Sequence, residues 1–134
     1  MDRFGMRALG LGLVCLLLVG AAGCRRSGGP AGALKKKPGE KVGKIVFVGQ
    51  KDACDCTKNR VAESWNALQF ALQKHKSVKV ERLALDVDQA RVKALKKQRR
   101  FMVVPALYFF SPAGKLVAML EGELKPNQIA QNIE

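Results

Sequence analysis

An uninterrupted apolar run, Ile45-Val46-Phe47-Val48, is the feature that most constrains the fold of this chain. The run is short and rich in β-branched residues, which favour strands over helices. Successive side chains of a strand point to opposite faces of its sheet, so an all-apolar strand must be covered on both faces. Residues 106–110 form a second apolar run that also fits a strand. We therefore expect an α/β domain whose sheet carries helices on both faces.

Sequence periodicity predicts the order β-α-β-α-β-β-α for this domain. The predicted strands are 45–48, 78–86, 106–110 and 115–120, and the predicted helices are 57–75, 88–100 and 125–134. The first two strands are expected to be parallel, because a helical crossover separates them. The last two strands flank the turn sequence at 111–114 and are expected to form a hairpin. The predicted sheet is therefore four-stranded and mixed.

Residues 1–23 have the pattern of an export signal. Two arginines precede an apolar run at 8–19, and small residues then lead to Cys24, which is typical of a signal peptide. The segment 21–24, Ala-Ala-Gly-Cys, resembles the lipobox of bacterial lipoproteins, with Ala21 where that family usually has leucine. The resemblance implies cleavage before Cys24 and lipid attachment to it, on the periplasm-facing side of a membrane of the cell envelope. The alternatives are an uncleaved anchor or an ordinary secretory signal.

Residues 24–43 are predicted to be the lipidated cysteine and a flexible tether, because their glycines, prolines and lysines offer no core to bury. The folded domain is then expected at 44–134. The formal net charge of +13 raises the question of a nucleic-acid partner. Export argues against nucleic acid, and anionic lipid headgroups are the simpler partner. A solvated basic surface explains the charge equally well.

Cys54 and Cys56 become the only free thiols once the signal is removed and Cys24 is lipidated. They follow a buried strand at the start of a predicted helix, and Val104-Pro105 precedes the third strand. Together with the hairpin at 106–122, these features resemble the thioredoxin superfamily over nearly the whole folded part. The resemblance implies a thioredoxin-like fold, a cis bond before Pro105, and a substrate chain held beside Val104 and Pro105.

The sequence departs from the superfamily pattern at the thiols and behind them. The common Cys-x-x-Cys motif is here Cys54-Asp55-Cys56. Phe47 and Ala84 stand where the family usually has a buried aspartate and its lysine partner. The family's additional N-terminal strand and helix have no counterpart, because the tether occupies that length. These departures argue against a plain thioredoxin-type reductant.

Thiol–disulfide exchange is the predicted chemistry, with Cys54 as the attacking thiol and Cys56 as the resolving one. Residues two apart can bridge only through a small, strained ring, so we expect an oxidising disulfide that is easily reduced. The expected partners are exported proteins with thiols or disulfides, and we expect a monomer without a cofactor. Two alternatives stay open: a structural disulfide in a redox-inactive interaction module, and soft-metal binding of Cu(I) or Zn(II) by the two thiolates.

Overall fold

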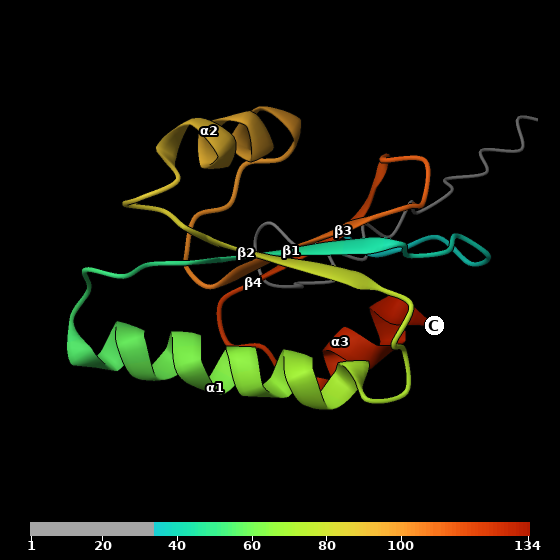
Figure 1. The fold of residues 1–134 in the computed structure, drawn as a ribbon, viewed down its shortest axis with the longest axis horizontal. Helices are drawn as coiled ribbons and strands as arrows, with labels where there is room; N and C mark the ends of the chain where they lie inside the picture. Colours follow the sequence, from blue (N-terminus) through green and yellow to red (C-terminus); the bar gives the residue numbers. More distant parts are fainter. Residues whose placement is uncertain (1–33) are drawn as a thin grey trace, which may run out of the picture.

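The computed structural model describes residues 34–134 and contains the predicted elements in the predicted order (Figure 1). The strands are β1 (Lys44–Gly49), β2 (Lys79–Ala84), β3 (Ala106–Phe110) and β4 (Leu116–Glu121). The helices are α1 (Asp55–Leu72), α2 (Gln89–Gln98) and α3 (Pro126–Ile133). The α/β class is confirmed. The predicted signal peptide and Cys24 lie outside the described residues.

The sheet has four strands in the order β2-β1-β3-β4. β1 runs parallel to β2 and antiparallel to β3, and β4 completes the hairpin with β3. The predicted mixed sheet is therefore confirmed. Val48 pairs with Ala106 and Gly49 pairs with Ala84. The carboxyl ends of β1 and β2 and the start of β3 therefore lie together along one edge of the sheet, the edge formed by strand ends.

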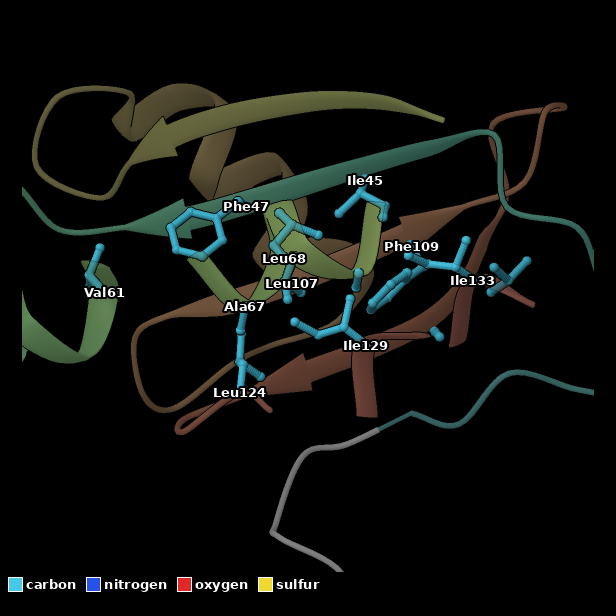
Figure 2. Close-up of a cluster of buried hydrophobic side chains, with 13 residues drawn as sticks. Ile45, Phe47, Val61, Ala67, Leu68, Leu107, Phe109, Leu124, Ile129 and Ile133 are labelled. Atoms are coloured by element: carbon cyan, nitrogen blue, oxygen red, sulfur yellow. The ribbon is translucent and has the colours of Figure 1, made fainter. Parts of the chain in front are cut away.

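Helices cover both faces of the sheet, as the all-apolar central strands require. Figure 1 shows α1 and α3 on one face and α2 on the other. The side chains of β1 alternate between the faces: Ile45 and Phe47 belong to the apolar cluster beneath α1 and α3, and Val46 and Val48 to the cluster beneath α2. Figure 2 shows the first cluster, in which Phe109 of β3 is also fully buried.

Residues 34–43, within the predicted tether, already contact the sheet. The N–H of Leu34 donates to the carbonyl of Met119 at 2.9 Å, and the N–H of Met119 donates back at 2.8 Å. The N–H of Gly43 donates to the carbonyl of Phe110 at 2.8 Å. Composition does not reveal these bonds, because they are made by backbone groups to strands far along the chain. The structure thus differs from a tether that is free as far as residue 43.

The ends of α1 also differ from the predicted range of 57–75. The helix begins at Asp55, because the extended backbone of Cys54 places its carbonyl to accept the N–H groups of Thr57 and Lys58 at 3.0 Å. It ends at Leu72, after which His75 closes a tighter turn onto Leu72. Within residues 34–134, no helix is long and apolar enough to cross a bilayer.

A matched pair of phenylalanine truncations tests this account of the core. Phe109→Ala removes a fully buried ring and should lower the free energy of unfolding by about 3–5 kcal/mol. Phe70 lies on α1 with 64 % of its surface exposed, and Phe70→Ala should change that free energy by about 0.5 kcal/mol or less. Urea denaturation followed by circular dichroism measures both. Equal losses in the two variants would contradict the assigned core.

Candidate functional site: a thiol pair at the edge of the sheet

The two cysteines lie where the chain leaves β1 and enters α1. Cys54 is the N-cap of α1, with an extended backbone at φ −64° and ψ 158°, and Cys56 is the second residue of the helix. Figure 1 shows this loop leading from the end of β1, past the edge of the sheet, to α1. The thiols therefore sit beside the first turn of a helix, where N–H groups lack helical partners and the helix dipole favours negative charge.

The thiol of Cys54 is placed to be stabilised as a thiolate. Its Sγ atom lies 2.8 Å from Sγ of Cys56 and 3.3 Å from Oγ1 of Thr57. Hydrogen bonds from the Cys56 thiol, the Thr57 hydroxyl and the Thr57 backbone N–H lower the pKa of Cys54 from 9.0 to about 7. Both cysteines are exposed and unbridged. An exposed thiol with such a pKa is about half ionised at neutral pH and is a competent nucleophile.

Asp86 anchors the loop that precedes the thiols. Its Oδ1 accepts the N–H of Lys51 at 3.1 Å, and its Oδ2 accepts the N–H of Asp52 at 2.6 Å. The Asp52 and Lys51 N–H groups stabilise the carboxylate and hold the pKa of Asp86 below its usual value. Asp86 follows β2, whose end adjoins the end of β1 in the parallel pair. The neighbouring strand thus fixes the loop leading to Cys54.

A second carboxylate, that of Glu121, holds the loop at 102–105, which leads into β3 at the same edge of the sheet. Glu121 ends β4 and is only 8 % exposed, and its Oε2 accepts the N–H of Met102 at 2.6 Å and of Val103 at 3.4 Å. The next residue, Gly122, donates its N–H to the carbonyl of Pro105 at 2.9 Å. The bond between Val104 and Pro105 is cis, as the resemblance implied. The 102–105 loop is therefore held at one end by Glu121, the last residue of β4, and at the other by Gly122, which follows it.

The structure brings the predicted site residues to one edge of the sheet. Cys54 and Cys56 are in direct contact. Val104 and Pro105 immediately precede β3, whose first residue pairs with the end of β1, so they lie at the edge from which the cysteine loop departs. Cys24, the predicted lipid attachment site, lies outside the described residues.

The positions behind the thiols are apolar. Phe47 is fully buried, and its ring lies edge-on to Trp65 with 5.2 Å between centroids. The guanidinium of Arg82 lies 4.8 Å from the Trp65 ring centroid, which makes a cation–π contact above this pair. In residues 34–134 the one buried carboxylate is Glu121, which contacts the opposite loop. The Cys54 thiolate is therefore stabilised by the Cys56 thiol, the Thr57 hydroxyl and backbone N–H groups, and not by a buried acid.

Metal ligands are sparse around the thiols. Across residues 34–134, no three histidine, cysteine or acidic side chains come together in a way that could hold a metal ion. His75 follows the far end of α1, about 24 Å or more from Cys56 by helical rise. Cys54 and Cys56 alone could supply two soft ligands.

Sequence reasoning missed the roles of Asp86 and Glu121. Asp86 is the last residue of the predicted second strand and lies two residues beyond the end of β2. The ends of two adjacent parallel strands meet, so its proximity to the cysteine loop was available as a signal. Glu121 follows the predicted strand 115–120, and no pattern in the sequence indicates that its side chain is buried. Its contacts with Met102 and Val103 span 19 and 18 residues. Periodicity does not report such long-range bonds.

Comparison with known proteins identifies the fold of this chain but not its activity. No protein-family model matches the sequence, and no curated protein matches it. A solved structure described as thioredoxin-2, a component of the malaria parasite protein secretion machinery, is similar with a TM-score of 0.53 and 8 % sequence identity. The similarity covers 68 % of this chain and 79 % of that one. The chain therefore has a thioredoxin-like fold.

The lowered pKa of Cys54 can be tested through alkylation. The rate at which iodoacetamide modifies reduced Cys54 should rise with pH through a midpoint near 7 rather than 9.0. Thr57→Val removes a hydroxyl that stabilises the thiolate, so the midpoint should move to higher pH. Thr57→Ser keeps the hydroxyl and should leave the midpoint low. Tandem mass spectrometry of the tryptic peptide 52–58 distinguishes Cys54 from Cys56, and an unshifted midpoint in Thr57→Val contradicts the assigned contact.

The charge on buried Glu121 can be tested through Tyr108, the only tyrosine of the chain. Burial, and then the negative charge of Glu121, raise the pKa of Tyr108 to about 12. Glu121→Gln removes that charge, so the phenolate should form at lower pH, as measured by absorbance at alkaline pH with the fold monitored by circular dichroism. Glu123→Gln, at an exposed neighbouring position, should leave the titration unchanged. An effect of equal size in both variants would contradict the influence of the Glu121 charge on the pKa of Tyr108.

Proposed function

We propose that this thioredoxin-like domain is a membrane-anchored thiol–disulfide oxidoreductase that exchanges or isomerises disulfides of exported proteins. The observation that carries the proposal is the pair of exposed thiols 2.8 Å apart at the start of α1, with a pKa of about 7 for Cys54. A nucleophilic thiolate with a second thiol in contact is the arrangement that disulfide exchange requires.

The exchange proceeds through a mixed disulfide. The Cys54 thiolate attacks one sulfur of a substrate disulfide, so a Cys54–substrate bond forms and a substrate thiolate leaves. In isomerisation, a substrate thiolate then attacks the mixed disulfide, forms a new substrate disulfide and returns Cys54 without net electron transfer. When Cys56 attacks Cys54 instead, the Cys54–Cys56 disulfide forms and the substrate leaves with both its sulfurs reduced. The reverse sequence moves two electrons from a substrate dithiol to the protein.

The substrate chain is proposed to lie along the 102–105 loop, beside the Val104 backbone. Met102 and Val103 expose 70 % and 46 % of their surfaces at this edge. An extended, partly unfolded segment would gain backbone hydrogen bonds and apolar contact there. Glu121 supports the loop from beneath, so we assign it a positioning role rather than a catalytic one.

The membrane anchor is proposed from the sequence of residues 1–24. A signal peptide at 1–23 and acyl chains on Cys24 would place the domain in the cell envelope, facing the periplasm of a bacterium. There, an oxidising compartment supplies substrates with disulfides and thiols. In this proposal the protein acts as a monomer and binds no nucleic acid.

The redox potential of the thiol pair tests the proposed activity. Equilibration of the full chain in glutathione buffers, with the bridged fraction of peptide 52–58 quantified by mass spectrometry, should give a potential less negative than about −270 mV, the thioredoxin value. Cys54→Ser should abolish turnover of a model disulfide. Cys56→Ser should instead trap the mixed disulfide on Cys54, because the resolving thiol is lost.

Three results would overturn the proposal. A potential at or below the thioredoxin value would contradict the oxidising character of the pair. Absence of turnover, together with stoichiometric Cu(I) binding that is lost in Cys56→Ser, would identify a metal site, and absence of both would identify a redox-inactive module.

A further inference from the structure

Within the part of the chain that the structure describes, the face of the sheet that carries α2 is only partly covered. Two helices, α1 and α3, pack on the other face, whereas α2 has ten residues and is the single helix described on its side. Figure 1 shows α2 above one end of this face and the turn between β3 and β4 rising at the other end. Between them lies a groove of about 830 Å³, formed by α2, the start of β1, the length of β2, the end of β3 with the turn after it, and residues 41–43.

The floor of this groove is apolar and its margin is cationic. The apolar groups include Val46, Leu83, Leu95 and Phe110. The charged residues are Lys41, Lys44, Lys79 and Arg91, with Glu81 as the one acidic member. Four positive charges against one negative leave a net charge of +3 around an apolar floor.

The single carboxylate neutralises only part of this margin. Glu81 forms ion pairs with Lys44, at 2.7 Å, and with Arg91. Lys41 and Lys79 are exposed and have no carboxylate partner within residues 34–134. Two cations therefore stand at the mouth of an apolar groove with their charge available to a ligand.

We propose that this groove binds a single-chain anionic amphiphile, a molecule with one carboxylate-like head and one apolar tail. Its size lies within the range of small-molecule sites. The apolar floor disfavours a wholly polar anion, and the lysines at the margin disfavour a cationic amphiphile. The groove opens at the first residue of β1, whereas the thiols follow its last residue, so the site is separate from the thiol pair and does not rest on the proposed redox activity.

α2 offers a matched pair of positions with which to test the groove. Ala94 lines it, whereas Ala90 lies one turn earlier on the same helix, is also exposed and does not line it. Tryptophan at residue 94 should fill the groove without entering the core, and tryptophan at residue 90 should not. Lys41→Glu/Lys79→Glu changes only the exposed margin. Its control is Lys97→Glu on α2, because Lys97 is exposed and does not line the groove.

The experiment is photolabelling of the full chain with a diazirine-bearing dodecanoate below its micelle concentration, with labelled peptides located by mass spectrometry. Label is expected at 91–98 and 110–112, competed by dodecanoate but not by acetate or by dodecyltrimethylammonium. Ala94→Trp should reduce this labelling by about tenfold, and Ala90→Trp by less than about twofold. Lys41→Glu/Lys79→Glu should reduce it by about tenfold, and Lys97→Glu by less than about twofold.

Several outcomes would overturn the proposal. Label confined to residues 1–33, or equal labelling of Ala94→Trp and Ala90→Trp, means that the groove is not the site. Equal competition by dodecyltrimethylammonium means that the binding is apolar only and not selective for an anion. If Ala94→Trp fails to fold, Lys41→Glu/Lys79→Glu provides the test instead, and unchanged labelling of that variant contradicts the proposal.

Discussion

The antiparallel pairing of β1 with β3 is the interaction on which the rest of the structure depends. Both strands are apolar on both faces, and every side chain of β3 is buried. Such a pair is stable only when flanking strands and helices on both sides remove it from water. The chain must therefore leave β1 at one edge, form α1 and return as β2. That path places Cys54 in the loop at the end of a buried strand. Reactive residues are often found on such loops, because the loop is exposed while the strand holds it in place.

The two carboxylates at this edge accept hydrogen bonds from backbone N–H groups and do not contact the thiols. Asp86 and Glu121 each accept two N–H groups from a loop, and the two loops flank the edge that carries the cysteines. Each carboxylate satisfies donors that have no partner in the sheet. The thiolate itself is stabilised by the Cys56 thiol, the Thr57 hydroxyl and Thr57 N–H. Loop geometry and thiol ionisation are thus controlled by different groups, and each can be altered separately.

The sequence predicted the framework of the fold because its signals are local. The apolar runs at 45–48 and 106–110 and the Val104-Pro105 step are each recognised from residues adjacent in the sequence, and the structure agrees with the architecture predicted from them. The start of α1 shifted by two residues because Cys54 acts as the cap, although its thiol makes no cap hydrogen bond. The supporting carboxylates and the contacts of residues 34–43 depend on partners far along the chain, which composition and periodicity do not encode.

The pairing of Leu34 with Met119 limits how far the folded domain can lie from a lipid anchor on Cys24. β4 is an edge strand, and its exposed backbone groups would otherwise be free to pair with another chain. By taking up two of them, Leu34 also fixes where the folded body begins. With a lipid on Cys24, as proposed, only residues 25–33 would separate the anchor from that point, and ten residue steps span at most roughly 35 Å when fully extended. The thiol pair would then work within a thin layer above the bilayer, on proteins that emerge from or lie close to the membrane.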